Sequence, residues 1–133
     1  MENKKTLEEV RKIFKNDRFA TENGAIIEEI GDYSAVCSLT ITDLHRNAMG
    51  AVMGGVYFTL ADFAFAVASN WENMECVSLQ SNVCFLGSAK GEKLIAKATC
   101  IKNGRNTALY QIDVTDELGN LTATITTTGY RIK

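Results

Sequence analysis

The chain has 133 residues, of which 46% are hydrophobic and 23% charged, and its formal net charge is −2 at pH 7. This composition excludes a disordered chain, and the length predicts a single domain over residues 1–133 that buries a sizeable core. The charge excludes general nucleic-acid binding through a basic excess, because no such excess is present to neutralise phosphates.

The N-terminal segment predicts a short amphipathic surface helix over residues 5–16. Leu7, Val10, Ile13 and Phe14 recur there at helical spacing among charged residues. This segment lacks the apolar stretch of a secretory signal. No uncharged apolar run in the chain reaches the ~20 residues that span a bilayer. We therefore expect a cytoplasmic protein with neither a nucleic-acid nor a membrane partner.

The next segments predict a loop, two strands and a long helix. Residues 16–24 (NDRFATENG) are typical of a loop, and residues 25–41 predict two strands that turn at Gly31-Asp32. Residues 54–70 have helical periodicity, with Gly, Ala, Phe and Val on all sides. A helix that is apolar all round must be wrapped by a larger element, and the remainder of the chain supplies only strands.

Four further strands are predicted after this helix. Asn103-Gly104 indicates a tight turn, and DELGN at residues 116–120 ends the next pair. A central helix within a consecutive antiparallel sheet is the hot-dog arrangement, so the predicted fold class is α+β, with the short N-terminal helix in addition. The four strands are expected at about residues 76–86, 92–102, 107–115 and 121–132.

The four cysteines and the single histidine give little sign of metal or thiol chemistry. The cysteines lie in apolar runs without a CxxC pair, which predicts four reduced core thiols and no zinc or redox site. Catalysis by a cysteine would need a histidine base, and only His45, expected in an exposed loop, is present. The cysteines are Cys37, Cys76, Cys84 and Cys100.

The central helix carries one carboxylate, Asp62, among apolar side chains. Such a group is costly to bury unless it is hydrogen-bonded or functional, and it suits a general base or a nucleophile. The alternative is a structural carboxylate that pairs with a loop. Gly54 and Gly55 open the same helix, where free N–H groups and the helix dipole stabilise an anion or oxyanion. Alternatively, these glycines only permit a tight turn.

Asp62 and Gly54 are separated along the helix. Asp62 lies eight residues beyond Gly54, which is roughly 12 Å in an α-helix. The two groups of one chain therefore cannot both contact one reacting carbonyl. If both serve one site, that site combines two chains, and two-fold pairing forms two equivalent sites.

Three short segments together resemble the PaaI-type acyl-CoA thioesterases of the hot-dog superfamily. They are Asn47, then Met53-Gly54-Gly55, then residues 60–62 (LAD). The similarity extends from the first helix through VCFLGSAKGEKLIAKA and NGRNTALYQIDVTDELG to GYRIK near the end, which covers nearly the whole chain. As a set, LADFAF and the later segments are fairly specific to this family.

The resemblance implies a role for each catalytic candidate. Asp62 attacks the thioester or activates water, and Gly54 stabilises the oxyanion through its backbone N–H. Asn47 positions the water or the carbonyl, and Ser78 assists water near the carboxylate of its own chain. In this family the two groups that correspond to Gly54 and Asp62 come from opposite subunits, commonly in a dimer of dimers. The resemblance therefore implies a homo-oligomer.

The resemblance also implies a coenzyme A site built from loops and strand ends. Lys90, Lys102 and Arg105 could meet the phosphates, although charges at turns are also commonly only solvated. Coenzyme A would enter as part of the substrate, with no other cofactor and no metal. The implied binding residues are Met53, Gly55, Phe85, Leu86, Gly87, Ser88, Lys90, Lys102, Gly104, Arg105 and Asn106.

Met53 stands where many members of the family have histidine. Methionine cannot donate a hydrogen bond to the thioester carbonyl, and loss of one such donor costs about 10²–10³ in rate. The predicted function is hydrolysis of an aromatic or short- to medium-chain acyl-CoA. One alternative is an acyl-CoA-binding sensor with weak or no turnover. A second, weaker alternative is a dehydratase or hydratase. This chemistry normally uses an Asp-His pair, and the central motif contains no histidine.

Overall fold

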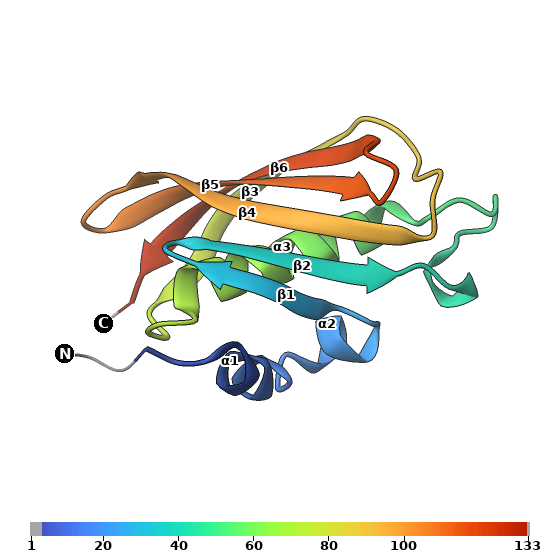
Figure 1. Ribbon diagram of the computed structural model, residues 1–133. Helices are drawn as coiled ribbons and strands as arrows, with labels where there is room; N and C mark the ends of the chain where they lie inside the picture. The colour runs from blue at the N-terminus through green and yellow to red at the C-terminus, as the bar shows by residue number, and fades with distance from the viewer. Residues whose placement is uncertain (1–3, 133) are drawn as a thin grey trace.

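The computed structural model describes residues 4–132 and has the predicted hot-dog architecture. A six-stranded antiparallel sheet wraps the long helix α3 (Gly54–Asn70), as Figure 1 shows. The strand bounds after α3 lie within one residue of the prediction. The strands are β1 (Ile26–Gly31), β2 (Ser34–Thr40), β3 (Cys76–Phe85), β4 (Lys93–Asn103), β5 (Thr107–Asp116) and β6 (Leu121–Arg131).

The prediction that the strands pair consecutively is wrong. The order across the sheet is β1-β2-β4-β5-β6-β3, so β2 pairs with β4 and β3 pairs with β6 at the far edge. The reason is the position of α3 in the chain. This helix follows β2 and crosses the concave face of the sheet, so the next strand begins at the opposite edge.

Helix α1 (Leu7–Phe14) confirms the predicted amphipathic surface helix. A capping box fixes its start, because the Thr6 hydroxyl accepts from the Glu9 amide at 3.2 Å and the Glu9 carboxylate accepts from the Thr6 amide at 2.8 Å. Val10 and Phe14 are buried, and the Phe14 ring packs edge-to-face on Phe63 of α3, with centroids 6.3 Å apart. Thus α1 covers part of the helix face that the sheet leaves open.

The prediction of a loop at residues 16–24 is wrong, since this segment contains the five-residue helix α2 (Arg18–Glu22). Only Ala20 is buried, so the segment shows no apolar periodicity. Local contacts hold the helix instead. The Thr21 hydroxyl donates to the Asp17 carbonyl at 3.1 Å, and the Ala25 amide donates to the Ala20 carbonyl at 3.0 Å.

Helix α3 is buried along most of its surface, as predicted, but one stripe stays accessible. Leu60, Ala61 and Ala64 are fully buried under the sheet. Besides Gly54, Val56 and Phe58 in the first turns, the accessible residues recur at intervals of three or four, so they lie on one face of the helix. They are Gly55, Thr59, Asp62, Ala66 and Ser69.

The prediction of four core thiols holds only in part. Cys37 and Cys76 are buried and Cys100 is half-buried, but Cys84 is exposed. Cys84 lies near the end of β3, and most residues of this edge strand are exposed on both of its faces.

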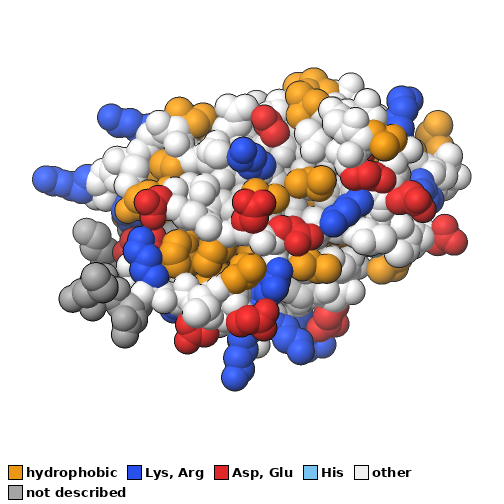
Figure 2. Space-filling model, viewed as in Figure 1, with side chains coloured by type: hydrophobic (Ala, Val, Ile, Leu, Met, Phe, Trp, Pro, Cys, Tyr) orange, Lys and Arg blue, Asp and Glu red, His pale blue; other side chains and the backbone are white. Residues whose placement is uncertain are grey.

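Figure 2 shows the face of the molecule on which β1, β2 and β4 lie toward the viewer. Acidic and basic side chains are interspersed there with small apolar groups. None of the described helices is both long and apolar enough to cross a bilayer.

Candidate active site

Asp62 lies in the middle of the accessible stripe of α3, and its side chain is half-buried. It faces a pocket of about 350 Å³ that also contains Asp17, Phe19, Phe58 and other residues of α2 and α3. Burial raises the pKa of the Asp62 carboxyl above its ordinary value, and the negative charge of Asp17 raises this pKa further. Within residues 4–132 the Asp62 carboxylate makes no hydrogen bond or ion pair, so the expected alternative of pairing with a loop is not observed.

The start of α3 exposes backbone donors. Met53 is the N-cap residue, and its side chain makes no capping hydrogen bond. The Val56 amide donates to the Met53 carbonyl at 2.9 Å. The N–H groups of Gly54 and Gly55 have no acceptor among the described residues. They point out of the positive end of a 17-residue helix. This end can therefore stabilise an oxyanion.

Phe85 closes over this helix start. A Cβ atom built on Gly54 would lie 3.2 Å from Cζ of Phe85, so glycine is what allows the ring to approach the helix so closely. The Phe85 ring also packs on Tyr57, with centroids 6.3 Å apart, and the Tyr57 hydroxyl accepts from the Ala89 amide at 3.1 Å. The segment 85–90, which carries the first predicted coenzyme A residues, is thus brought to the Gly54 end of α3.

Asp116 anchors the remainder of this segment. Its carboxylate accepts from the amides of Lys90 and Gly91 at 2.8 and 3.2 Å, and from the Asn120 side chain at 2.9 Å. These hydrogen bonds hold the pKa of Asp116 well below its usual range, and the one from the Asn120 side chain has the largest effect. Asp116 was not among the residues predicted from the sequence, although its carboxylate fixes the backbone at Lys90.

Asn47 closes the loop that precedes α3. Its side-chain oxygen accepts from the amides of Met49 and Ala51 at 2.9 and 3.1 Å, and its own amide donates to the Ala51 carbonyl at 2.8 Å. The side-chain nitrogen of Asn47 has no acceptor among the described residues, which leaves a hydrogen-bond donor available in the loop that precedes α3.

The prediction of an exposed His45 is wrong, since this side chain is buried. The Thr42 amide donates to Nδ1 of His45 at 2.9 Å, and Nε2 lies 2.6 Å from the Asn23 carbonyl. Nδ1 is therefore the acceptor and Nε2 carries the proton. The His45 carbonyl accepts from the Met53 amide at 2.9 Å. His45 thereby connects the end of α2 to the start of α3.

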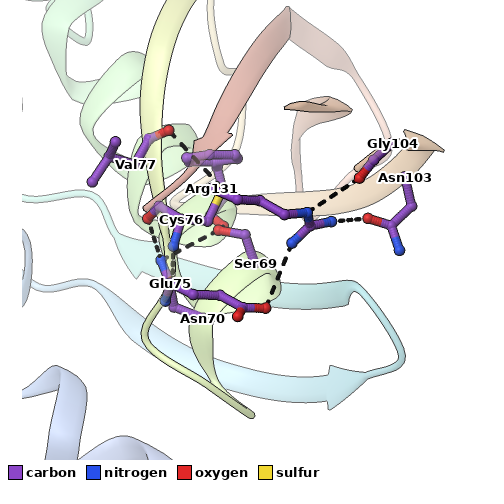
Figure 3. A network of polar contacts seen from close by, with 9 residues as sticks. Ser69, Asn70, Glu75, Cys76, Val77, Asn103, Gly104 and Arg131 are labelled. Carbon is purple, nitrogen blue, oxygen red and sulfur yellow. Dashed lines mark hydrogen bonds and ion pairs between the residues drawn. The ribbon is translucent and has the colours of Figure 1, made fainter. Parts of the chain in front are cut away.

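The second predicted coenzyme A segment lies at the opposite end of the molecule. In Figure 3 the Arg131 guanidinium lies between the β4–β5 hairpin and Glu75, which follows α3 in the chain. Arg131 donates to the Gly104 carbonyl at 3.2 Å, bonds Asn103, and forms an ion pair with Glu75 at 3.6 Å. This network therefore fixes the hairpin that carries Lys102, Gly104, Arg105 and Asn106.

The length of β3 separates the two segments. The strand runs for ten residues from Cys76, paired with Arg131, to Phe85, which lies on Gly54, a span of about 30 Å. One chain therefore does not bring the hairpin to its own Gly54. Ser78 is exposed on β3, one residue before a register shift in its pairing with β6.

The sequence of this chain matches the model of one protein family, described as the thioesterase superfamily, over residues 49–123. The chain belongs to the thioesterase superfamily. It is 32% identical over 121 residues to a putative esterase of Archaeoglobus fulgidus, covering 90% of this chain and 79% of the relative. It is 29% identical over 121 residues to acyl-coenzyme A thioesterase PaaI of Escherichia coli, covering 90% of this chain and 86% of PaaI.

Solved structures agree with this assignment. The E. coli PaaI structure superposes with a TM-score of 0.86 at 28% identity, covering 92% of this thioesterase and 89% of PaaI. A hypothetical thioesterase from Streptococcus pneumoniae with coenzyme A superposes with a TM-score of 0.80 at 25% identity, covering 89% of this chain and 95% of that one. The predicted PaaI-type hot-dog family is confirmed, and the protein is a thioester hydrolase.

Two residues of this thioesterase that lie beside Asp62 were not predicted from the sequence. Asp17 and Phe19 line the same pocket, and both belong to the segment that was predicted as a loop. No periodic pattern marks them, because α2 is short and Phe19 is exposed. Within residues 4–132 no group of three or more His, Cys, Asp or Glu side chains is arranged to hold a metal ion.

Proposed function

We propose that this thioesterase hydrolyses an acyl-CoA to the free acid and coenzyme A, with Asp62 as the reacting carboxylate. The observation that carries the proposal is a half-buried carboxylate with no partner among residues 4–132, facing a pocket, with its pKa raised by burial. A carboxylate without hydrogen bonds keeps its lone pairs available for a substrate or a water molecule. The name of the E. coli relative supports an acyl-CoA as the substrate.

The reaction needs a hydrogen-bond donor that stabilises the oxyanion, and a nucleophile or general base. The thioester carbonyl oxygen accepts from the Gly54 N–H, which stabilises the negative charge that develops on it. Asp62 then acts in one of two ways. Its oxygen adds to the carbonyl carbon and expels the coenzyme A thiolate, leaving an anhydride that water cleaves, or it takes a proton from a water molecule that adds instead. Both routes add one water and release the acid and the thiol.

We propose that two subunits share each site, paired through β3. In the single chain β3 is an edge strand, and its residues 76–85 contain no charged side chain. Antiparallel pairing of two β3 strands would bring the hairpin of one subunit to the end of the sheet where the partner subunit has its helix start. The two coenzyme A segments, about 30 Å apart in one chain, would then flank one site.

This arrangement would also resolve the separation of the catalytic groups. Gly54 and Asp62 lie eight residues apart on one continuous helix, about 12 Å along its axis. A two-fold axis between neighbouring α3 helices would place the Gly54 amide of one subunit near the Asp62 carboxylate of the other. Ser78, on β3, would lie close to this axis. Further pairing would give the dimer of dimers that the family resemblance implies.

The second candidate function is an acyl-CoA sensor with little turnover, and Met53 is the observation that favours it. The Met53 side chain is 51% exposed at the helix start, and its terminal carbon lies 3.1 Å from the position of a Cβ atom built on Gly55. It therefore occupies the place of a potential donor without donating a hydrogen bond. Binding of acyl-CoA would be retained, while polarisation of the carbonyl would rest on the Gly54 amide alone.

The test is the substitution Asp62→Asn, assayed for thiol release and for thermal unfolding on the same preparation. If Asp62 reacts, turnover falls by at least about 10²-fold, while acyl-CoA affinity holds. The melting temperature stays level or rises, because a costly buried charge has been removed. Asp32→Asn is the matched control, since the Asp32 side chain is 82% exposed on the β1–β2 turn. Full turnover in Asp62→Asn with a lower melting temperature would instead assign Asp62 a structural role.

A further inference from the structure

Phe19 of α2 stands beside the accessible stripe of α3. Its side chain is 76% exposed, yet it lines two separate hollows of the surface. One is the pocket of about 350 Å³ that contains Asp62. The other is a pocket of about 210 Å³ at the start of α3, which contains Met53 and Gly55. Phe19 therefore lies at the boundary between the two.

The two pockets follow one another along α3. Thr59, the only other residue within 4–132 that lines both, precedes Asp62 by three residues, or roughly one helical turn. An extended apolar group that begins at Asp62 and runs back along the stripe would meet the Phe19 ring before it reached the second pocket. The wall of that second pocket is largely apolar, with Leu39 and Val56 among its residues.

The charges around the first pocket bear on which groups it accepts. Asp17 and Asp62 both line it. Arg18, the one cation among its described lining residues, is in an ion pair with Glu22. A group ending in a carboxylate would be repelled by both aspartates, with no uncommitted cation among the described lining residues to offset the repulsion. The polar atoms of the second pocket include His45, whose ring is already hydrogen-bonded to Thr42 and Asn23.

We infer that Phe19 determines acyl specificity: its ring ends the acyl pocket that starts at Asp62, restricts the pocket to compact uncharged acyl groups, and closes off the second pocket. The inference rests on the proposed hydrolysis of acyl-CoA. It goes beyond that proposal because it assigns the acyl group to one side of α3 and names the residue that limits its length.

The experiment compares wild type, Phe19→Ala and Phe19→Trp on butyryl-, octanoyl-, dodecanoyl- and phenylacetyl-CoA. Each additional methylene buried is worth roughly fourfold in binding. In the wild type, kcat/KM should stop rising once the chain reaches Phe19. In Phe19→Ala the ratio of dodecanoyl to butyryl kcat/KM should rise at least about tenfold, and in Phe19→Trp it should fall. Ile101→Ala, which removes an exposed apolar side chain from β4, is the matched control.

A second experiment measures binding independently of hydrolysis. It determines by calorimetry the affinity for the S-butyl-, S-octyl- and S-dodecyl-CoA thioethers. If no acyl-CoA is hydrolysed but Phe19→Ala gains affinity for the longer thioethers, the specificity role stands and the hydrolytic proposal fails. If wild type hydrolyses acyl-CoA and all variants keep its chain-length profile, the role of Phe19 is refuted. A changed oligomeric state by light scattering, with the profile unchanged, would likewise refute it and assign Phe19 to a subunit contact.

Discussion

The substitution Gly54→Ala should separate the stability of the helix start from its catalytic use. The added methyl group would lie 3.2 and 3.3 Å from Cζ and Cε1 of the Phe85 ring, a few tenths of an ångström inside ordinary contact. Phe85 is 58% exposed, so the ring can move outward by that amount. Alanine is favoured over glycine in a helix by up to about 1 kcal/mol. The two effects oppose each other, and we expect a melting temperature within about 4 °C of wild type.

Turnover should respond far more strongly. The methyl group and the displaced Phe85 ring would stand next to the free Gly54 N–H, where a thioester carbonyl must lie to accept from it. Loss of one such oxyanion donor costs about 10²–10³ in kcat. The assay is thiol release with saturating acyl-CoA, alongside thermal unfolding of the same sample.

Ser69→Ala provides the control for this experiment. Ser69 is on the same helix at its other end, where its hydroxyl donates to the Phe65 carbonyl at 2.8 Å. This change should leave turnover within about twofold of wild type, because it adds no atom near Gly54. A Gly54→Ala protein that folds and turns over at the wild-type rate would refute the assignment of the oxyanion donor.

Three further predictions follow from the same site. Met53→His should raise the rate of thiol release if a missing donor limits turnover, whereas an inactive wild type that stays inactive would favour the sensor. Burial first, and then the charge of Asp17, raise the pKa of Asp62 above 3.8. Because the ionised carboxylate is the reacting form, the acid limb of the profile of kcat/KM against pH should lie above pH 3.8. Asp17→Asn should move this limb to lower pH, and an unmoved limb would show that Asp62 does not control it. Light scattering at micromolar concentration should find at least a dimer, and a lone 14.6 kDa species would contradict the shared site.

Local patterns predicted the fold well, because the elements that carry them are strongly periodic. The apolar residues of α3 and the alternation in the later strands placed both to within about a residue. The order of the strands in the sheet could not be predicted from these local patterns. The pairing of β2 with β4 depends on where α3 crosses the sheet and not on the residue pattern of either strand. Helix α2 was missed since it buries only Ala20.

The site was predictable where residues lie close in sequence and less so where distant segments meet. Gly54 and Asp62 could be selected from one helix, and their roles stay predictions. The burial of His45 depends on the Asn23 carbonyl, 22 residues earlier, which no local pattern reports. The same holds for Asp17 and Phe19, which reach Asp62 only because α2 packs beside α3.

The two edges of the sheet have different consequences for handling the protein. The β1 edge carries the charged residues Glu28 and Glu29, which discourage a second strand from pairing there, whereas a register shift occurs in both edge strands. The β3 edge has no charged residue and no proline, and it exposes Val77 and Leu79. Under the proposed pairing, a newly made chain is therefore open to edge-to-edge aggregation until its partner subunit covers β3. Soluble yield should accordingly depend on the rate of assembly, and a lysine introduced into β3 should produce a soluble chain that remains unassembled.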